Sequence, residues 1–261
     1  MPSLGIITCQ ILELEFAHIL SNDPDVASVR VLENRFAHGF CEAMERNGGR
    51  RVERIRYLAP QSDGSPAGVD VVVRIMEVGL HRVIQELKNA VRGAASELAG
   101  DVDAILVGYG LCGNAFQNPD ELFADIGVPI FMPADGDHVV DDCVGLVIGG
   151  REQYYEEQCR CAGTMFLTPG WARHWKTVLL SGIGKRYDLK MVKRLMAEYK
   201  RLLLLPTPVM SEEEMGPSAQ EFIEMFGLEP QVRAGTFSLL DHTWAAVKRS
   251  VVKEDNLIEL R

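Results

Sequence analysis

The stretch DVDAILVGYGLCGN, residues 101–114, determines both the fold and the candidate site. Its first half is apolar from Ala104 to Val107, which is typical of a strand buried on both faces of a parallel sheet. Its second half places three glycines around Cys112, and a glycine-rich turn lets the backbone approach a ligand closely. We therefore expect a parallel strand that delivers Cys112 into a turn at the carboxyl edge of a sheet.

Apolar strand patterns alternate with helical patterns along the whole chain. Strands are predicted at residues 4–8, 28–32, 69–76, 101–107, 128–131, 202–205 and 229–240, and residues 142–148 fit either a strand or a buried helix. Apolar residues recur three and four positions apart after Gly79, as a helix requires. This alternation predicts the α/β class: mostly parallel sheets flanked by helices, Rossmann-like, with the site at the carboxyl ends of strands. Residues 1–261 would form one α/β domain or two closely packed α/β lobes, with a boundary near residue 100 or 200.

Composition excludes several classes of protein. The formal net charge of −10 argues against a nucleic-acid groove, which requires clustered Lys and Arg. No apolar run approaches the ~18 residues of a membrane span, and no secretory signal pattern is present at the start, so we expect a cytoplasmic protein that does not enter a membrane. Six cysteines are too few for a disulfide scaffold of this length, so they are expected to be buried, reactive or metal-bound.

Two of the cysteines follow predicted strands that are distant in sequence. Cys9 comes directly after the first strand, and Cys112 lies just beyond the fourth. Ligands of parallel sheets bind beyond the carboxyl ends of strands, so both thiols are expected on one rim. Gly110 and Gly113 would let the backbone approach a ligand there. Residues 108–113 match a dinucleotide-binding pattern only loosely, because no acidic residue stands about 20 positions on at a second strand end.

The segment DGDHVVDDCVG, residues 135–145, supplies a third cysteine, Cys143, among acidic residues and a histidine. A thiol, carboxylates and an imidazole within a few positions fit a metal site or an acid–base group, and equally a solvated acidic turn. Cys159 and Cys161 are only two positions apart, closer than in the usual zinc knuckle, and their role is left open.

Several of these motifs together resemble the uncharacterised prokaryotic family DUF1638, a domain of unknown function. The resemblance covers nearly the whole chain and rests on ITCQILELE, VGLHRV, ILVGYGLCGN, DDCVGLVIGG, GTMFLTPGW and GTFSLLD. The family pattern falls on these positions: Cys9, His81, Cys112, Asn114, Cys143 and Trp171. The resemblance also implies an association with corrinoid-dependent methyl metabolism in anaerobes, and therefore a corrinoid or methyltransferase partner.

The leading hypothesis is a metal site held by Cys9, Cys112 and Cys143. Three ligands leave one coordination position open, as in catalytic metal sites, and the metal would be zinc or a [4Fe–4S] cluster. The protein would then be a metalloenzyme acting on a small-molecule substrate, for example a transferase or lyase. The remaining candidates are assigned by role: His81 and Asp142 to acid–base chemistry, Asn114, Gly110 and Gly113 to holding an anionic group, and Glu13 and Trp171 to contacts around the cofactor.

Two alternatives remain open at this stage. One is a non-catalytic accessory protein that binds a metal, a corrinoid or a partner enzyme through the same rim. The other is an enzyme that uses Cys112 as a nucleophile, activated at a helix N-terminus with His81 as the base.

Overall fold

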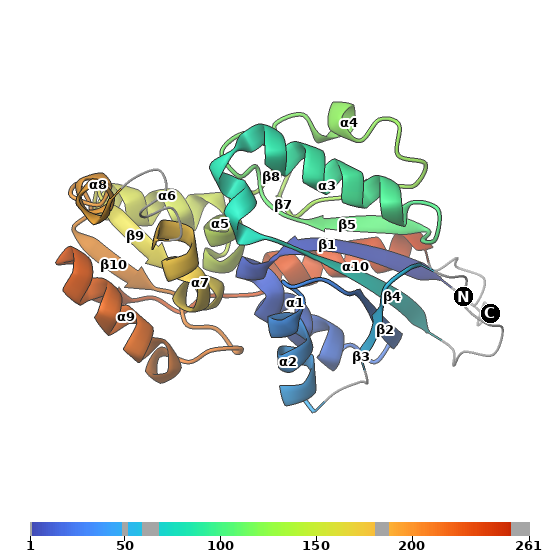
Figure 1. Ribbon diagram of the computed structural model, residues 1–261, viewed down its shortest axis with the longest axis horizontal. Helices are drawn as coiled ribbons and strands as arrows, with labels where there is room; N and C mark the ends of the chain where they lie inside the picture. Colours follow the sequence, from blue (N-terminus) through green and yellow to red (C-terminus); the bar gives the residue numbers. More distant parts are fainter. Residues whose placement is uncertain (1, 49–51, 59–67, 181–187, 252–261) are drawn as a thin grey trace, which may run out of the picture.

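The computed structural model describes residues 2–48, 52–58, 68–180 and 188–251, and its strands form two parallel sheets and a short hairpin (Figure 1). The larger sheet has the order β3-β2-β4-β1-β5-β6 and the smaller one the order β11-β10-β9. The strands of the larger sheet are β1 (Ser3–Cys9), β2 (Val26–Leu32), β3 (Val52–Ile55), β4 (Val69–Met76), β5 (Ala104–Gly108) and β6 (Ile130–Phe131). Those of the smaller sheet are β9 (Thr164–Leu167), β10 (Arg201–Leu204) and β11 (Glu229–Val232), and the hairpin pairs β7 (Ala134–Asp135) with β8 (His138–Val139). The predicted α/β class with mostly parallel sheets is confirmed.

Helices cover both faces of the larger sheet (Figure 1). Successive side chains of a strand point to opposite faces, so Leu4 and Ile6 of β1 pack on one face and Ile7 and Cys9 on the other. The first face is covered by α1 (Glu13–Asn22), α2 (His38–Arg46) and α10 (Ser238–Val251). The second is covered by α3 (Ile84–Leu98). The outcome is a three-layer core in which Cys9 belongs to the α3 side.

The smaller sheet has its own core. Leu202 and Leu204 face α7 (Pro169–Leu180) and α9 (Glu212–Phe226), whereas Phe166 and Leu203 face the other way. That opposite side carries α6 (Arg151–Arg160), whose Tyr154 packs edge-on against Phe166. The short helices α4 (Pro119–Leu122), α5 (Cys143–Ile148) and α8 (Leu189–Leu195) complete the described part. Whether the two sheets are one domain or two lobes stays a prediction.

The start of α7 packs directly on the segment that follows β1. A Cβ added at Gly170 would lie 1.8 Å from the carbonyl oxygen of Ile11, so only glycine allows this approach. Ile11 belongs to a short 3-10 helix, η1 (Gln10–Leu12), and a second one, η2 (Val78–Arg82), follows β4. The carboxyl ends of the central strands of the larger sheet therefore face α7, in the middle of Figure 1.

Of the two alternatives predicted for residues 142–148, the structure has the helix: Cys143–Ile148 form α5, because the Asp142 side chain caps it. Two predicted strands differ in the structure. The strand predicted at 229–240 ends at Val232, and α10 begins at Ser238. Between them the chain crosses back to the larger sheet, with the Thr236 amide donating to the Val147 carbonyl. The strand predicted at 128–131 shortens to two residues.

Candidate functional site

The three cysteines predicted at the rim pack into one cluster. Cys9 ends β1, Cys112 lies in the turn after β5, and Cys143 is the first residue of α5. Cys9 is 2% exposed, and the other two thiols are partly buried against the same apolar cluster. The three thiols therefore lie near one another beside α7, at the carboxyl ends of parallel strands where ligands commonly bind.

The turn that carries Cys112 has an uncommon backbone. Cys112, Gly113 and Asn114 have φ angles of 47°, 66° and 68°, so three consecutive residues are left-handed and two of them are not glycine. Such conformations cost of order 1–3 kcal/mol for a non-glycine residue and persist only where surrounding contacts impose them. Here the Leu111 amide donates to the Val140 carbonyl at 2.8 Å, and the Cys112 amide donates to the Asp141 carbonyl at 3.0 Å. The turn is thereby fixed to the segment that leads into Cys143.

Gly110 and Gly113 have different functions in this turn. A Cβ at Gly110 would lie 2.5 Å from the Val140 carbonyl oxygen and 2.7 Å from the Asp142 backbone, so Gly110 permits the two cysteine-bearing loops to touch. Gly113 has open space around its Cα and lines the cavity described next. Gly113 is thus accessible to a ligand, whereas Gly110 allows the two loops to pack closely.

A cavity of about 530 Å³ lies over Cys112 and Cys143. Its walls include the predicted residues His81, Asp142, Gly113 and Trp171. Side chains that were not predicted also line it: Arg82, Tyr154, Phe166, Tyr199, Gln158 and Thr164, with the apolar Ile84, Val144 and Met165. An aromatic cavity with a few polar groups and thiols on its floor has the general character of a small-molecule site.

Burial and nearby acidic groups raise the pKa of all three thiols. Burial raises the pKa of Cys9 to about 12 against opposing backbone hydrogen bonds, and the nearby Glu13 and Glu15 add to the rise. Burial also raises the pKa of Cys112, with further increments from Cys9 and Asp142. The pKa of Cys143 is raised by burial and then by Asp142, Cys9 and Cys112. The three groups therefore interact electrostatically and are neutral thiols at pH 7.

Each sulfur nevertheless accepts hydrogen bonds that favour its thiolate. The backbone of Ile11 and Leu12 hydrogen-bonds to Cys9 at the start of η1, and the backbone of Gly110 does so to Cys112. The Trp171 side chain bonds to Cys143. Hydrogen bonds to the charged form lower the pKa of a thiol, so these donors would stabilise thiolates once a cation had compensated their charge.

Asp142 holds Cys143 in place. Its Oδ1 accepts from the amides of Val144 at 2.8 Å and Gly145 at 2.9 Å, and the Tyr154 hydroxyl donates to Oδ2 at 3.1 Å. Burial raises the pKa of Asp142 despite these bonds. Both oxygens are engaged, so the observed role of Asp142 is to position α5, and its acid–base role stays a prediction.

His81 follows β4 in η2 and reaches the same cavity. Its ring stacks on Tyr109, with ring centroids 5.9 Å apart, and burial lowers its pKa, so the imidazole is neutral at pH 7. Within the part of the chain that the structure describes, neither its buried Nε2 nor the buried Tyr109 hydroxyl has a hydrogen-bond partner. Unpaired buried polar atoms are uncommon in folded proteins, and here two of them lie next to the thiols.

The other predicted residues lie elsewhere. Glu13 is fully buried beside α2, where its Oε1 is 2.9 Å from His174 Nε2, and it does not line the cavity. Asn114 is exposed, and Cys159 and Cys161 lie at the end of α6, outside the cavity lining. Sequence patterns gave no signal for Tyr154, which pairs with Asp142 across 12 positions, and only adjacency to the turn could have indicated Tyr109.

The described residues contain neither a preformed metal site nor a membrane-spanning helix. Among the residues that the structure describes, no three His, Cys, Asp or Glu side chains are already placed to hold a metal ion. Over the same residues, every helix is too short or too polar to cross a membrane.

Comparison with known proteins gives one match. A family model described as "Protein of unknown function (DUF1638)" matches residues 75–244, which include His81, Cys112, Cys143 and Trp171. Neither the curated proteins nor the solved structures contain a match.

Proposed function

The chain belongs to the DUF1638 family, and we propose that it is a metal-binding protein whose ligands are Cys9, Cys112 and Cys143. One observation supports the proposal most strongly: three thiols from separate segments interact with one another, two of them line one cavity, and each accepts a hydrogen bond from an N–H group. Thiolates are the ligands that zinc and iron–sulfur clusters prefer, so the metal is zinc or a [4Fe–4S] cluster.

The electrostatics of the thiols fit a cation. Each thiolate would be buried near other acidic groups, which makes its formation costly without a compensating positive charge. A metal ion supplies that charge and releases the thiol protons. Because no trio of ligands is already in place, binding requires rotation of the cysteine side chains between staggered rotamers.

The metal would keep one coordination position for a small molecule in the cavity, and would act there as a Lewis acid or a thiol activator. Trp171 and the Asp142–Tyr154 pair position Cys143, and the neutral imidazole of His81, which lines the cavity, would move a proton. The Gly113 amide is available to an anionic group of the substrate. A transferase or lyase reaction fits this arrangement.

The raised pKa of Cys112 weighs against its use as a free nucleophile. A nucleophilic cysteine needs a lowered pKa, from a helix N-terminus or a nearby cation. Burial and the neighbouring Cys9 and Asp142 act in the opposite direction. The metal proposal accounts for the same environment without requiring a free thiolate.

The test is zinc titration of metal-free protein with a competing chromophoric chelator. Wild type is expected to bind zinc tightly and to release protons. Cys112→Ala is expected to weaken binding by at least about 100-fold, because the loss of a residue that only supports a metal ligand already costs about 10–100-fold. Cys159→Ala, an exposed cysteine outside the cavity, is the matched control and should bind as wild type. Equal zinc affinity in folded Cys112→Ala and wild type would remove the proposal.

A further inference from the structure

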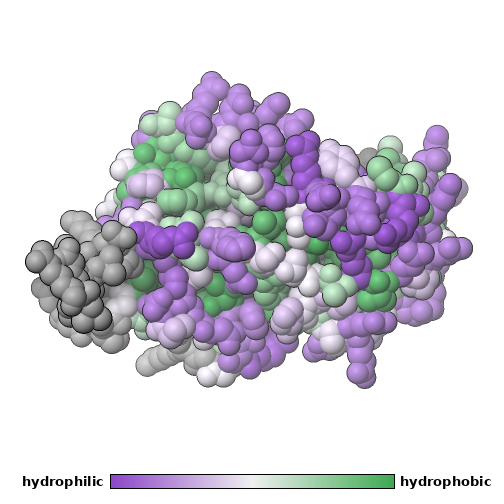
Figure 2. Space-filling model, turned by 180° about the vertical axis from the view of Figure 1, so that it is seen from behind, coloured by the Kyte–Doolittle hydropathy of each residue, from purple (hydrophilic) through white to green (hydrophobic). Residues whose placement is uncertain are grey.

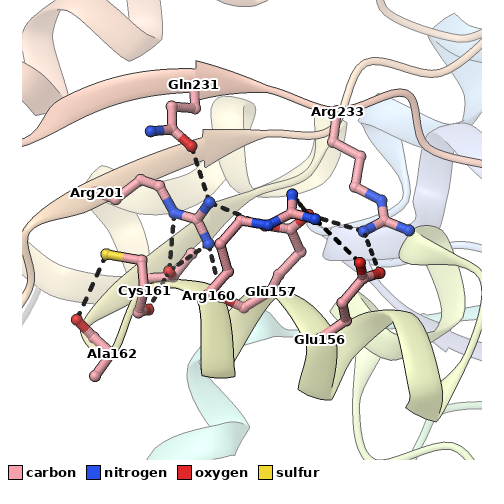
Figure 3. Close-up of polar contacts among 9 residues, drawn as sticks. Glu156, Glu157, Arg160, Cys161, Ala162, Arg201, Gln231 and Arg233 are labelled. Carbon is pink, nitrogen blue, oxygen red and sulfur yellow. Dashed lines mark hydrogen bonds and ion pairs between the residues drawn. The ribbon is translucent and has the colours of Figure 1, made fainter.

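Helix α6 separates the thiol cavity from a second cavity. Tyr154 and Gln158 line the thiol cavity, whereas a cavity of about 370 Å³ lies beside the neighbouring residues of the same helix. Its polar walls come from α6, β10 and the end of β11 (Figure 3), and they consist of Glu156, Glu157, Arg160, Arg201, Gln231 and Arg233. In Figure 2 the most strongly hydrophilic colouring lies over the right half, the side of the smaller sheet.

Three guanidinium groups converge on the carboxylate of Glu157, whose side chain is 2% exposed. Arg160 and Arg233 contact Oε1 at 2.9 and 2.8 Å, and Arg201 contacts Oε2 at 2.9 Å. Although burial opposes it, hydrogen bonds from Arg233 and Arg201 hold the pKa of Glu157 below its usual value. Glu157 is therefore ionised, and its charge alone cannot neutralise three cations.

The guanidinium group of Arg201 is held by hydrogen bonds and an ion pair within the protein. Its side chain is 3% exposed, its Nε and Nη2 donate to the Thr164 hydroxyl at 3.0 and 2.8 Å, and Nη1 donates to Gln231. Nη2 also donates to the Glu157 carbonyl. Arg201 thus fixes α6 to the sheet and has no donor directed at a ligand.

Arg233 differs from Arg201 in both exposure and bonding. Its side chain is 27% exposed, and its contacts with Glu157 and, at 3.4 Å, Glu156 use Nη1 only. Its Nε and Nη2 make no hydrogen bond or ion pair with the residues that the structure describes. This Nε/Nη2 edge is the one with which arginine binds a carboxylate or phosphate through two parallel bonds.

The charge balance also favours an anion. Three arginines meet two glutamates here, which leaves one positive charge in excess in a chain with a formal net charge of −10. Glu156 bridges Arg160 and Arg233 through a side chain that is 53% exposed. An exposed carboxylate is held weakly because solvent screens it. Glu156 therefore occupies a position that another oxyanion can take.

We infer that Arg233 and Arg160 form a binding site for the oxyanion group of a small molecule, a phosphate or a carboxylate. The anion binds to the Nε/Nη2 edge of Arg233 and extends to Arg160, in competition with Glu156. Glu157 and Arg201 hold the two arginines in place. This site is distinct from the thiol cavity and does not depend on a metal.

Isothermal titration calorimetry of the full chain with inorganic phosphate and with acetate, at constant ionic strength set by chloride, tests the inference. Saturable binding of at least one anion is expected, and the two arms distinguish phosphate from carboxylate. Arg233→Gln should weaken binding by about tenfold or more, the loss expected for one charge-assisted hydrogen bond or more. Arg56→Gln, which removes an arginine 80% exposed in a single ion pair, is the matched control and should leave binding unchanged.

Glu156→Gln should change the affinity for the anion in the direction opposite to that of Arg233→Gln. It removes the competing carboxylate without touching the buried ion pairs, so it should tighten anion binding. This variant keeps the inference testable even if Arg233→Gln fails to fold. The inference is overturned if neither anion binds saturably to wild type and Glu156→Gln, or if folded Arg233→Gln binds as wild type does.

Discussion

Glu15 offers the sharpest test of the buried electrostatics beside the thiols. It lies on α1 with no exposed surface, and among the described residues no group other than its own backbone amide hydrogen-bonds to its carboxylate. Burial raises its pKa from 4.5 to about 8, and the nearby Glu13 adds to the rise while Arg173 opposes it. At pH 7 the folded protein therefore carries Glu15 in its protonated form, whereas the unfolded chain carries it ionised.

This difference sets a stability cost that depends on pH. Below pH 4.5 both the folded and the unfolded state carry Glu15 protonated, and its contribution to stability is fully present. As the pH rises from 4.5 toward 8, the unfolded chain releases the proton while the folded protein still retains it, so the unfolded state is favoured and this contribution is lost. One pKa unit corresponds to about 1.4 kcal/mol, so between pH 4.5 and pH 7 the loss is about 3 kcal/mol. Glu15→Gln is nearly isosteric and does not titrate, so it removes this loss.

The assay is urea unfolding of wild type and Glu15→Gln at pH 5, 6, 7 and 8. The free energy of unfolding of Glu15→Gln minus that of wild type should increase by about 1.4 kcal/mol for each pH unit up to pH 7. A change in packing adds a constant to this difference and does not alter the trend. Glu53→Gln, on exposed surface, is the control and should show no such trend. A stability difference between Glu15→Gln and wild type that does not change with pH would refute the reasoning.

Four further substitutions test the packing around both cavities. Gly110→Ala places a Cβ against backbone atoms 2.5 Å away and should lower the free energy of unfolding by about 1–3 kcal/mol. Gly113→Ala has room for its Cβ and should lower the free energy of unfolding by only about 1 kcal/mol, because of the left-handed φ. Urea unfolding compares the two variants, and equal losses would contradict the role of Gly110. Tyr154→Phe removes the hydrogen bond to Asp142 and should cost about 1 kcal/mol in the same assay and raise the pKa of Asp142, read by NMR titration; an unchanged pKa would count against the bond. Arg201→Met leaves a buried carboxylate with fewer partners and should destabilise by about 3–5 kcal/mol at pH 7 in thermal or urea unfolding; a loss below about 1 kcal/mol would show that the ion pair is dispensable.

The sequence predicted the larger sheet well, because its strands are short apolar runs with clear ends. The strand predicted at residues 69–76 has the same bounds in the structure, and Cys9 and Cys112 meet because parallel strands share a carboxyl edge. For residues 142–148 the sequence allows two structures, because the short apolar run after Asp142 fits a strand as well as a buried helix. The cap formed by Asp142 decides between them.

Long-range pairing of polar residues could not be predicted. Glu15 stands in the segment ELEFAH, where an acidic residue ordinarily marks an exposed helix face, yet α1 is buried nearly all round. Arg201 and Glu157 are 44 positions apart and look like surface charges until the sheet and α6 enclose them. Such contacts depend on how elements pack, and hydrophobic periodicity contains no information about them.

The central claim is that Cys9, Cys112 and Cys143 hold a metal, and the metal and acid-labile sulfide content of protein purified without oxygen tests it most directly. The proposal predicts either about one zinc per chain without sulfide or about four iron and four sulfide per chain with a matching absorption spectrum. Protein that contains neither, that binds no zinc or iron on reconstitution, and whose three thiols alkylate independently would contradict the claim.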